Sequence, residues 1–389
     1  MTAPPTHRPH RLAALPDLGV DAAARAAGSD PDVLRLENLD TDVPPAPAVL
    51  AVTRESVGLD EANSYLPFNG LLDLREAVAG RLRRDTGIDY DPEQDVVVTC
   101  GGTEGLFDAL LATVEDGDEV VVTDPTYVGM VNRVRMAGAT PVFVPFRRRE
   151  GEWRLDLDAL AQAVTARTRA LFVMNPSMPS GAVLNGTEWD AIAAVCREHG
   201  CWLIYNAAME RIVFDGRPVV HPAALDGLAD HVITVGSVSK EHRMIGWRVG
   251  WVAGPRAVMA DITRAHLFNV VTPVSLTQRA AAEALRGPDA DVEAAVAEWQ
   301  RRRDVVVAEL AAYDAVPAAG GWSLLVDVSS RGLAAREAAA RLLERGRVAA
   351  TPMDGWGEVN GPQHVRVVFA NEPVERLRGL GERFAAALG

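Results

Sequence analysis

Short apolar runs alternate with amphipathic helical stretches along most of the chain, and this pattern predicts the fold. Apolar, β-branched runs predict strands, and apolar residues that recur every three or four positions predict helices. Helices are predicted at 71–84, 103–114, 127–137 and 187–198. Strands are predicted at 95–100, 119–123, 141–145, 169–174, 202–206, 231–236 and 249–253. Buried strands separated by helices form parallel sheets covered on both faces, so we expect a large α/β domain with a mostly parallel sheet of the seven-stranded type.

The alternation becomes looser after Thr272 and Pro273, which indicates a second, smaller α+β domain. In the opening of the chain, prolines predict an irregular arm, because proline fixes φ and removes a backbone donor. We therefore divide the chain into an N-terminal arm at 1–45 that contributes to the small domain, a large domain at 46–275 and a small domain at 276–389. The elements predicted for the small domain are helices at 289–313, 334–345 and from about residue 373, and strands at 323–328 and 364–369.

Composition and charge narrow the class of protein. With 48% hydrophobic and 24% charged residues, the 389-residue chain has a globular composition. Its net charge of −14 argues against a nucleic-acid partner, which needs a basic surface. The three cysteines and eight histidines form no metal-ligand spacing, so no metal is expected. No stretch is apolar enough for a signal peptide or a membrane span, so we expect a cytoplasmic protein with no membrane partner.

Lys240 is the first candidate for chemistry. It follows the predicted strand at 231–236 and has the hydroxyls of Ser237 and Ser239 beside it. A lysine at a strand end, with Arg248 eight residues further on, suits a Schiff base to a carbonyl cofactor whose phosphate is held by these neighbours. The alternative is an ordinary solvated loop lysine.

A glycine-containing connection is the second candidate. Residues 99–104 join a predicted strand to a predicted helix through Gly101 and Gly102. Glycines at such a position let backbone N–H groups at the helix N-terminus approach an anion closely, which suggests a phosphate cup. Taken alone, the same segment is more typical of a tight connection, and it gains weight when joined to Lys240 and Arg248.

Five further segments occur in order along the chain, at 65–75, 124–127, 175–181, 205–211 and 364–367. Among them are Asp-Pro-Thr-Tyr at 124–127 and Asn-Pro-Ser-Met-Pro-Ser-Gly at 175–181. Together with Lys240 and Arg248, these segments resemble those of the class I/II aminotransferases of fold type I over nearly the whole chain. The resemblance implies pyridoxal 5′-phosphate as the cofactor and a role in amino acid metabolism.

The resemblance also implies roles for the residues around the cofactor. Lys240 would be the catalytic residue, forming the Schiff base and moving the proton. Tyr127 would stack on the pyridine ring, with core filling as its alternative role. Tyr65 would reach the phosphate of the neighbouring subunit, which implies a homodimer with shared active sites, and the alternative for it is a surface aromatic. The phosphate of the same subunit would be held by Gly102, Thr103, Ser237, Ser239 and Arg248.

Two residues define the substrate side by the same resemblance. Arg366 would bind the substrate α-carboxylate in a bidentate fork. It lies on an apolar strand where an unpaired charge is costly, so we expect a buried carboxylate partner for it. Leu39 lies in the segment Asn38-Leu39-Asp40, where the family has a glycine that contacts substrate through the backbone, so the substrate entrance is expected to differ.

Three predicted cofactor contacts depart from the family. Asn206 replaces an aspartate that faces the pyridine nitrogen, and Met178 and Met209 replace two residues that donate to the ring hydroxyl. A neutral amide cannot favour a protonated nitrogen as a carboxylate does. Charge-assisted hydrogen bonds exceed neutral ones by about 1–2 kcal/mol, so we expect removal of the substrate α-proton to be slowed at least tenfold. The alternative is drift within a working transaminase.

These observations leave three functions in competition. The first is amino-group transfer from an L-amino acid to a 2-oxo acid, favoured by Lys240, Arg248 and Arg366. The second is another pyridoxal-phosphate reaction, such as β-elimination, decarboxylation or oxidative deamination, suggested by Asn206 and the two methionines. The third, a non-enzymatic regulator, is disfavoured because the N-terminal arm is too short and proline-rich for a DNA-binding extension.

Overall fold

The computed structural model describes residues 12, 15 and 19–389 of the chain. A sheet of eight strands in the order β2-β9-β8-β7-β6-β3-β4-β5 forms its larger part. The neighbouring strands from β8 to β4 are parallel, while β9 runs antiparallel to both β8 and β2. The strands are β2 (Val96–Thr99), β3 (Glu119–Asp124), β4 (Thr140–Arg149), β5 (Glu152–Leu155), β6 (Thr168–Met174), β7 (Trp202–Asn206), β8 (Val232–Ser237) and β9 (Gly250–Ala253).

One strand, β5, is additional to the seven that the pattern predicts. β4 turns back into β5 through Glu150 and Gly151, which both have positive φ, 52° and 81°. Two such residues in a row are typical of the hairpin turn that matches the right-handed twist of strands. Arginines at 147–149 interrupt the apolar pattern of these two strands, so hydrophobicity alone does not reveal the hairpin.

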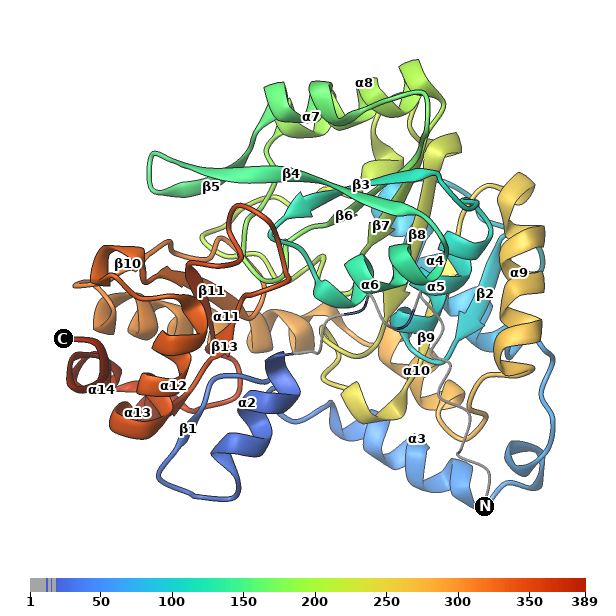
Figure 1. The fold of residues 1–389 in the computed structure, drawn as a ribbon. Coiled ribbons are helices and arrows are strands. Elements are labelled where there is room, and N and C mark those ends of the chain that lie inside the picture. The colour runs from blue at the N-terminus through green and yellow to red at the C-terminus, as the bar shows by residue number, and fades with distance from the viewer. Residues whose placement is uncertain (1–11, 13–14, 16–18) are drawn as a thin grey trace, which may run out of the picture.

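Helices cover both faces of the large sheet, and its central strands are mostly buried for that reason (Figure 1). α7 and α8 lie on one face, and α5 and α6 lie on the other (Figure 1). α5 approaches β9 closely: a Cβ on Gly105 would lie 2.7 Å from a methyl group of Val252. The helices around this sheet are α4 (Leu72–Thr86), α5 (Gly102–Leu111), α6 (Val128–Met136), α7 (Leu157–Ala163), α8 (Gly186–His199), α9 (Arg256–Val270) and α10 (Gln278–Arg286).

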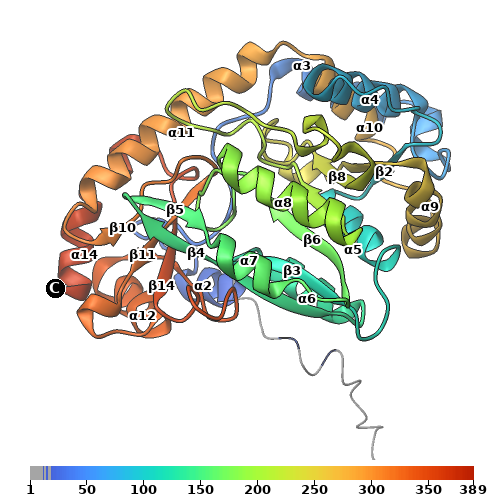
Figure 2. The same ribbon diagram turned by 90° about the horizontal axis from the view of Figure 1, so that it is seen from above.

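A second sheet lies in the C-terminal part of the chain, with the antiparallel order β10-β11-β14-β13. The long helix α11 leads to it along the side of the molecule (Figure 2). One buried hydrophobic cluster contains residues of both sheets, so the two parts share a core. The elements are α11 (Asp289–Glu309), β10 (Asp314–Ala315), β11 (Ser323–Asp327), α12 (Ala335–Gly346), β12 (Val348–Ala349), β13 (Thr351–Pro352), β14 (His364–Val368), α13 (Val374–Leu377) and α14 (Leu380–Leu388).

The N-terminal arm is more regular than its prolines predict. It contains α2 (Gly19–Ala27) and β1 (Leu34–Arg35), which pairs with β12 in parallel, and α3 (Pro47–Val57) follows the arm directly. Pro47 is the first residue of α3, where a missing backbone donor costs nothing. The prediction of an irregular arm is therefore wrong for α2 and β1, while residues 1–11, 13–14 and 16–18 of the predicted arm lie outside the described part. Within the described residues, no helix is both long and apolar enough to cross a membrane.

Candidate active site

A cavity of about 340 Å³ is formed where the connections that follow several strands meet. Ligands of open α/β sheets bind at this edge, beyond the carboxyl ends of the parallel strands. Its lining brings together every predicted site residue except Met209 and Tyr65. The predicted residues in it are Leu39, Gly102, Thr103, Tyr127, Met178, Asn206, Ser237, Ser239, Lys240, Arg248 and Arg366.

Lys240 lies in this cavity, in the connection that follows β8. Its Nζ donates to the backbone carbonyl of Leu39 at 2.6 Å and lies 4.8 Å from the centre of the Trp322 ring. No carboxylate of the described residues lies within ion-pair distance of this nitrogen. Lys240 is also the only lysine in the whole sequence, in which all other cationic side chains of the Lys/Arg type are arginine. This count is a signal that the sequence analysis did not use.

The surroundings of Lys240 favour its neutral form. Burial lowers the pKa of Lys240 to about 8; Asp40 opposes this change, and the charges of Arg366 and Arg248 add to it. A neutral amine is the nucleophilic form, so the cavity makes Lys240 reactive toward a carbonyl group near neutral pH.

Chemical labelling can measure this pKa. In the cofactor-free protein, we expect the rate of carbamoylation of Lys240 by cyanate to rise with pH through about 8 and to level off near pH 9, because only the neutral amine reacts. Because the chain has one lysine, mass spectrometry of a single peptide separates this reaction from that of the N-terminus. Asp40→Asn should move the midpoint to lower pH. A midpoint at the ordinary value for lysine, near 10.5, would contradict the prediction.

One end of the cavity is built to hold an anion. α5 begins at Gly102, and Gly101 before it has φ of +78°. A Cβ on Gly101 would collide with the guanidinium of Arg248, so only glycine allows this close approach. Arg248 donates to the carbonyl of Ile245 at 3.0 Å and forms no ion pair within the described part of the chain. A helix N-terminus beside an unpaired guanidinium is a typical phosphate site.

Arg366 is at another part of the lining and is fully buried. It donates to the carbonyl of Glu37 and, at 3.2 Å, to the hydroxyl of Thr351, and its guanidinium lies 4.9 Å from the centre of the Trp356 ring. Nε of Arg366 has no hydrogen-bond partner among the described residues. Burial lowers the pKa of Arg366 to about 10, against the opposing charge of Glu37.

Among the described residues, no carboxylate forms an ion pair with Arg366, so the buried carboxylate partner expected for it is left to a ligand. Glu37 is the nearby acid, but its carboxylate turns away and accepts from Arg35 at 2.8 Å. Arg366 is instead held by neutral acceptors and an aromatic face, which leave part of its guanidinium free for a ligand carboxylate.

Asn206 is the last residue of β7 and faces the cavity. Its side-chain oxygen accepts from the backbone N–H of Ala208 at 3.1 Å, and its amide nitrogen lies 3.6 Å from the sulfur of Met174. Because the oxygen is already engaged, the amide presents its N–H groups to a ligand. Asn206 can thus donate a hydrogen bond, but it brings no negative charge.

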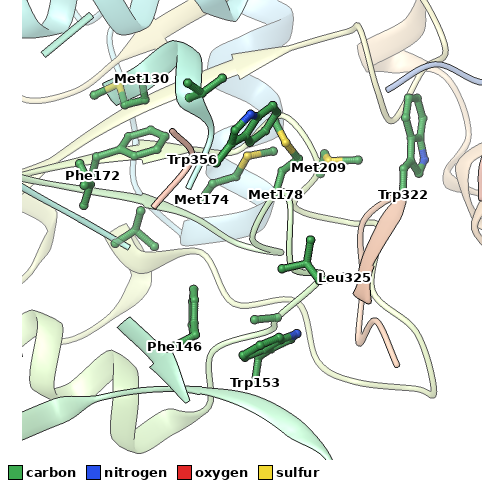
Figure 3. Close-up of a cluster of buried hydrophobic side chains, with 14 of the residues drawn as sticks. Met130, Phe146, Trp153, Phe172, Met174, Met178, Met209, Trp322, Leu325 and Trp356 are labelled. Atoms are coloured by element: carbon green, nitrogen blue, oxygen red, sulfur yellow. The ribbon is translucent and has the colours of Figure 1, made fainter. Parts of the chain in front are cut away.

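Met174, Met178 and Met209 belong to the buried cluster drawn in Figure 3. Met174 and Met178 line the cavity, whereas Met209 is buried but is not part of its lining. The sulfur of Met178 lies 3.6 Å from Nη1 of Arg366. Met178 therefore lies at the part of the cavity where Arg366 would bind a carboxylate. The sulfurs of Met174 and Met178 make this side of the cavity soft and apolar.

Trp356 is a lining residue that the sequence analysis missed. Its ring lies edge-on to that of Tyr127, with centroids 6.5 Å apart. Asp124 at the end of β3 fixes its loop, since its carboxylate accepts backbone N–H groups of Glu358, Val359 and Asn360 at 2.7–3.0 Å. An aromatic residue between two glycines gives no local signal for such a role. Other lining residues missed were Val20, Asp21, Asn38, Leu106, Val128, Met174, Ala208 and Ile245.

Tyr65 is not brought to this cavity. It is 79% exposed and lines a separate hollow together with Thr272, Ser275 and Leu276. Within a single chain, Tyr65 therefore contributes nothing to the site described above.

A buried acidic pair and a histidine support the helix that carries the anion site. His266 lies 2.6 Å from Glu104 and 2.8 Å from the carbonyl of Phe68 through its two ring nitrogens, and Asp108 is nearby. Burial alone would lower the pKa of His266, but the hydrogen bond and charge of Glu104 raise it. With an acceptor at each nitrogen, the ring fits its doubly protonated form. The structure thus brings together three potential metal ligands that the sequence spacing did not predict. Two of them, His266 and Glu104, already form a hydrogen-bonded ion pair with each other.

Comparison with known proteins identifies the family. Residues 32–384 match the model of the aminotransferase class I and II family. The chain is 36% identical over 383 residues to the arginine–pyruvate transaminase AruH of Pseudomonas aeruginosa, covering 96% of this chain and 95% of that protein. It is 33% identical over 328 residues to the aromatic-amino-acid aminotransferase 2 of Thermococcus litoralis, covering 83% and 84%.

Solved structures agree with this result. The N-succinyldiaminopimelate aminotransferase of Mycobacterium tuberculosis superposes with a TM-score of 0.92 at 32% identity and covers 98% of this chain and 100% of that chain. These findings confirm the predicted family, the fold class and the cofactor class. The chain belongs to the class I and II aminotransferases and is a pyridoxal-phosphate-dependent aminotransferase.

Proposed function

We propose that the protein transfers the amino group of an L-amino acid to a 2-oxo acid, with its site built from the residues of the cavity described above. The observation that carries this proposal is the presence of three cations, Lys240, Arg248 and Arg366, in one cavity without an ion-pair partner among the described residues. Arg366 is fully buried and Lys240 is partly buried, and an unpaired charge in such a place is costly, so we expect a ligand to supply the negative charge there, with the exposed Arg248 adding a third cation.

The residues of the cavity fit pyridoxal phosphate. The N-terminus of α5 and Arg248 suit a phosphate, and Ser237 and Ser239 lie in the same lining. Tyr127 supplies an aromatic face for a ring, and Asn206 supplies a hydrogen-bond donor for its nitrogen. A volume of about 340 Å³ is within the range of small-molecule sites. When bound, the cofactor supplies an aldehyde and an aromatic ring that stabilises negative charge at the substrate α-carbon.

The residues of the cavity have separate roles in binding the substrate and in moving its α-proton. Arg366 binds the α-carboxylate and so fixes the substrate α-carbon relative to Lys240. The ε-amine of Lys240, with its lowered pKa, takes the α-proton and returns it, while the carbonyl of Leu39 and the Trp322 ring hold the amine in place. Met178 and Trp356 keep water from the Arg366 side, which strengthens the carboxylate contact.

A substrate panel tests this function. The purified protein, loaded with pyridoxal phosphate, is incubated with L-amino acids with and without a 2-oxo acid, and absorbance and products are followed together. With an acceptor present, we expect the amino acid to be converted to its 2-oxo acid over many turnovers. Without an acceptor, we expect at most one 2-oxo acid molecule per active site. Multiple turnovers with release of ammonia or carbon dioxide in the absence of an acceptor would instead support the second candidate, another pyridoxal-phosphate reaction, which the neutral side chain of Asn206 in the cavity favours.

The proposal includes a homodimer in which Tyr65 acts on the partner's site. Segments 57–72 and 266–276 lie side by side, joined by contacts of Ser275 with Ala62 and of His266 with Phe68. Exposed apolar patches of this kind are typical of protein interfaces. The exposed hydrophobic side chains there are Val57, Tyr65, Phe68, Leu72, Phe268, Val271 and Val274.

Mixing two inactive variants tests the shared site. We expect Tyr65→Ala and Lys240→Ala proteins to be nearly inactive apart, and to regain activity when refolded together, because one mixed dimer then holds one intact site. Light scattering should give twice the chain mass of 41.7 kDa. A monomer in solution would overturn the dimer, and an active Tyr65→Ala variant would overturn the shared site.

Two further assignments complete the proposal. The division at 1–45, 46–275 and 276–389 is supported by the separate sheets within the last two ranges. A reducing compartment such as the cytoplasm is supported by the three free cysteines, Cys100, Cys196 and Cys201.

A further inference from the structure

One charged residue of the cavity has no role in the proposed function. The lining contains three cations, assigned to the α-proton, the phosphate and the α-carboxylate, and a single acidic residue, Asp21. Asp21 lies in the first turn of α2 and is exposed at the mouth of the cavity, beside Val20, which also lines it.

The fold places Asp21 on the substrate side. A Cβ on Gly19, the first residue of α2, would lie 3.4 Å from the carbonyl oxygen of Pro352 in β13. In the same strand, Thr351 is the register partner of Arg366 and accepts a hydrogen bond from it. α2 is therefore docked beside the strand pair that holds the α-carboxylate-binding arginine, and its first turn reaches the mouth from there.

The rest of the lining excludes some substrates and suits others. No arginine or lysine beyond Lys240, Arg248 and Arg366 is present among the described lining residues to pair with a second carboxylate, so an acidic side chain finds no partner. Val20, Leu39 and Ile245 instead offer aliphatic surface to a chain of methylene groups. The net charge of −14 also attracts cations to the molecule as a whole.

From this arrangement we infer that the substrate is an L-amino acid with a cationic side chain, a guanidinium or an ammonium on an aliphatic stem, and that Asp21 is the residue that selects it. The inference rests on the proposed function and deepens it. The relative named as an arginine–pyruvate transaminase, 36% identical over 96% of this chain, supports it. The ordinary role for an acid in a first helical turn is to complement the helix dipole, which would affect stability and leave selectivity unchanged.

Turnover measurements separate these two roles. The ratio of kcat/KM for L-arginine to that for L-norleucine is compared among the wild type, Asp21→Asn and a matched control, Asp32→Asn. Asp32 is an exposed residue that follows the same helix and does not line the cavity. We expect the ratio to fall about fivefold to tenfold in Asp21→Asn and to stay unchanged in the control, since loss of one exposed charged contact is worth about 1 kcal/mol. An equal ratio in all three proteins would overturn the inference.

A binding measurement tests the inference apart from turnover. 5-Guanidinopentanoate has a carboxylate for Arg366 and a guanidinium for Asp21, but no amino group to transfer. Calorimetry should find that it binds more tightly than hexanoate, that Asp21→Asn removes this preference, and that 0.5 M salt weakens it by screening. If L-norleucine is converted but neither preference depends on Asp21, the inference fails and the proposed function stands. If no amino acid is converted at all, the proposed function fails.

Discussion

Replacing Arg366 with methionine is expected to lower kcat/KM for the amino-acid substrate by about 10²- to 10³-fold without loss of folding stability. Truncating one partner of a buried, hydrogen-bonded charge pair costs about 2–5 kcal/mol, and about 1.4 kcal/mol corresponds to a factor of ten. The effect is large because Arg366 is the one cation left for the α-carboxylate once Lys240 and Arg248 have their own roles.

The same substitution lowers activity but is not expected to lower the free energy of unfolding. In the cofactor-free protein, the guanidinium of Arg366 is buried against neutral groups, and this burial lowers its pKa to about 10. A cation whose pKa is lower in the folded state than in the unfolded state destabilises the fold at every pH below that lower value, so wild type carries the cost at neutral pH. Methionine has a similar length and no charge. We expect the free energy of unfolding to stay the same or to rise by about 1 kcal/mol.

Steady-state kinetics and urea denaturation of the same preparations check both parts. Arg366→Lys is the matched variant, because it keeps the charge but loses the planar fork that binds a carboxylate at two points. We expect the lysine variant to have a kcat/KM between those of the methionine variant and the wild type. Because it keeps a buried charge, we do not expect its free energy of unfolding to rise as it does in the methionine variant. A methionine variant that is as active as the wild type would remove Arg366 from the substrate site.

The order of strands and helices was predictable because each central strand is a short apolar run bounded by turn residues. The run at 202–206 coincides with β7, and those at 169–174 and 119–123 differ from β6 and β3 by one residue at an end. α2 and β5 were missed for a shared reason. Their residues are partly exposed and include charged positions, so tertiary contacts, rather than a strong hydrophobic period, define them.

The candidate site divides in a similar way. Lys240, Gly102 and Arg248 were predictable because catalysis and phosphate binding require those residue types at strand ends and helix starts. Trp356 and Asp21 were not, because neither lies in a local motif. Their loop and helix reach the cavity only through packing: Asp124 holds the loop of Trp356, and Pro352 supports the start of α2. Residues that select a substrate also reach a site through packing rather than through a local motif. For this reason the sequence predicted the chemistry of the site but not its substrate.

Replacing Asn206 with aspartate is expected to raise the rate of amino-group transfer at least tenfold, the second large effect. Aspartate has the same shape, and one of its oxygens can accept from the N–H of Ala208 as the amide does now. Its second oxygen would then face the ring nitrogen with a negative charge, which favours the protonated nitrogen where the amide cannot. The gain follows from the difference of about 1–2 kcal/mol between charge-assisted and neutral hydrogen bonds, to which a change in ring protonation adds.

Cofactor binding provides a readout that does not depend on turnover. Without cofactor, the new carboxylate would lie beside the sulfur of Met174 in a largely buried position, so Asn206→Asp should lower the melting temperature of the cofactor-free protein. Saturating pyridoxal phosphate should raise the melting temperature more in this variant than in the wild type, since tenfold tighter binding adds about 1.4 kcal/mol of stabilisation. Asn206→Ala, which has neither donor nor charge, should lose affinity and activity together. If aspartate changes neither, the amide at position 206 does not limit the reaction, and the slow step lies with the groups that hold the substrate.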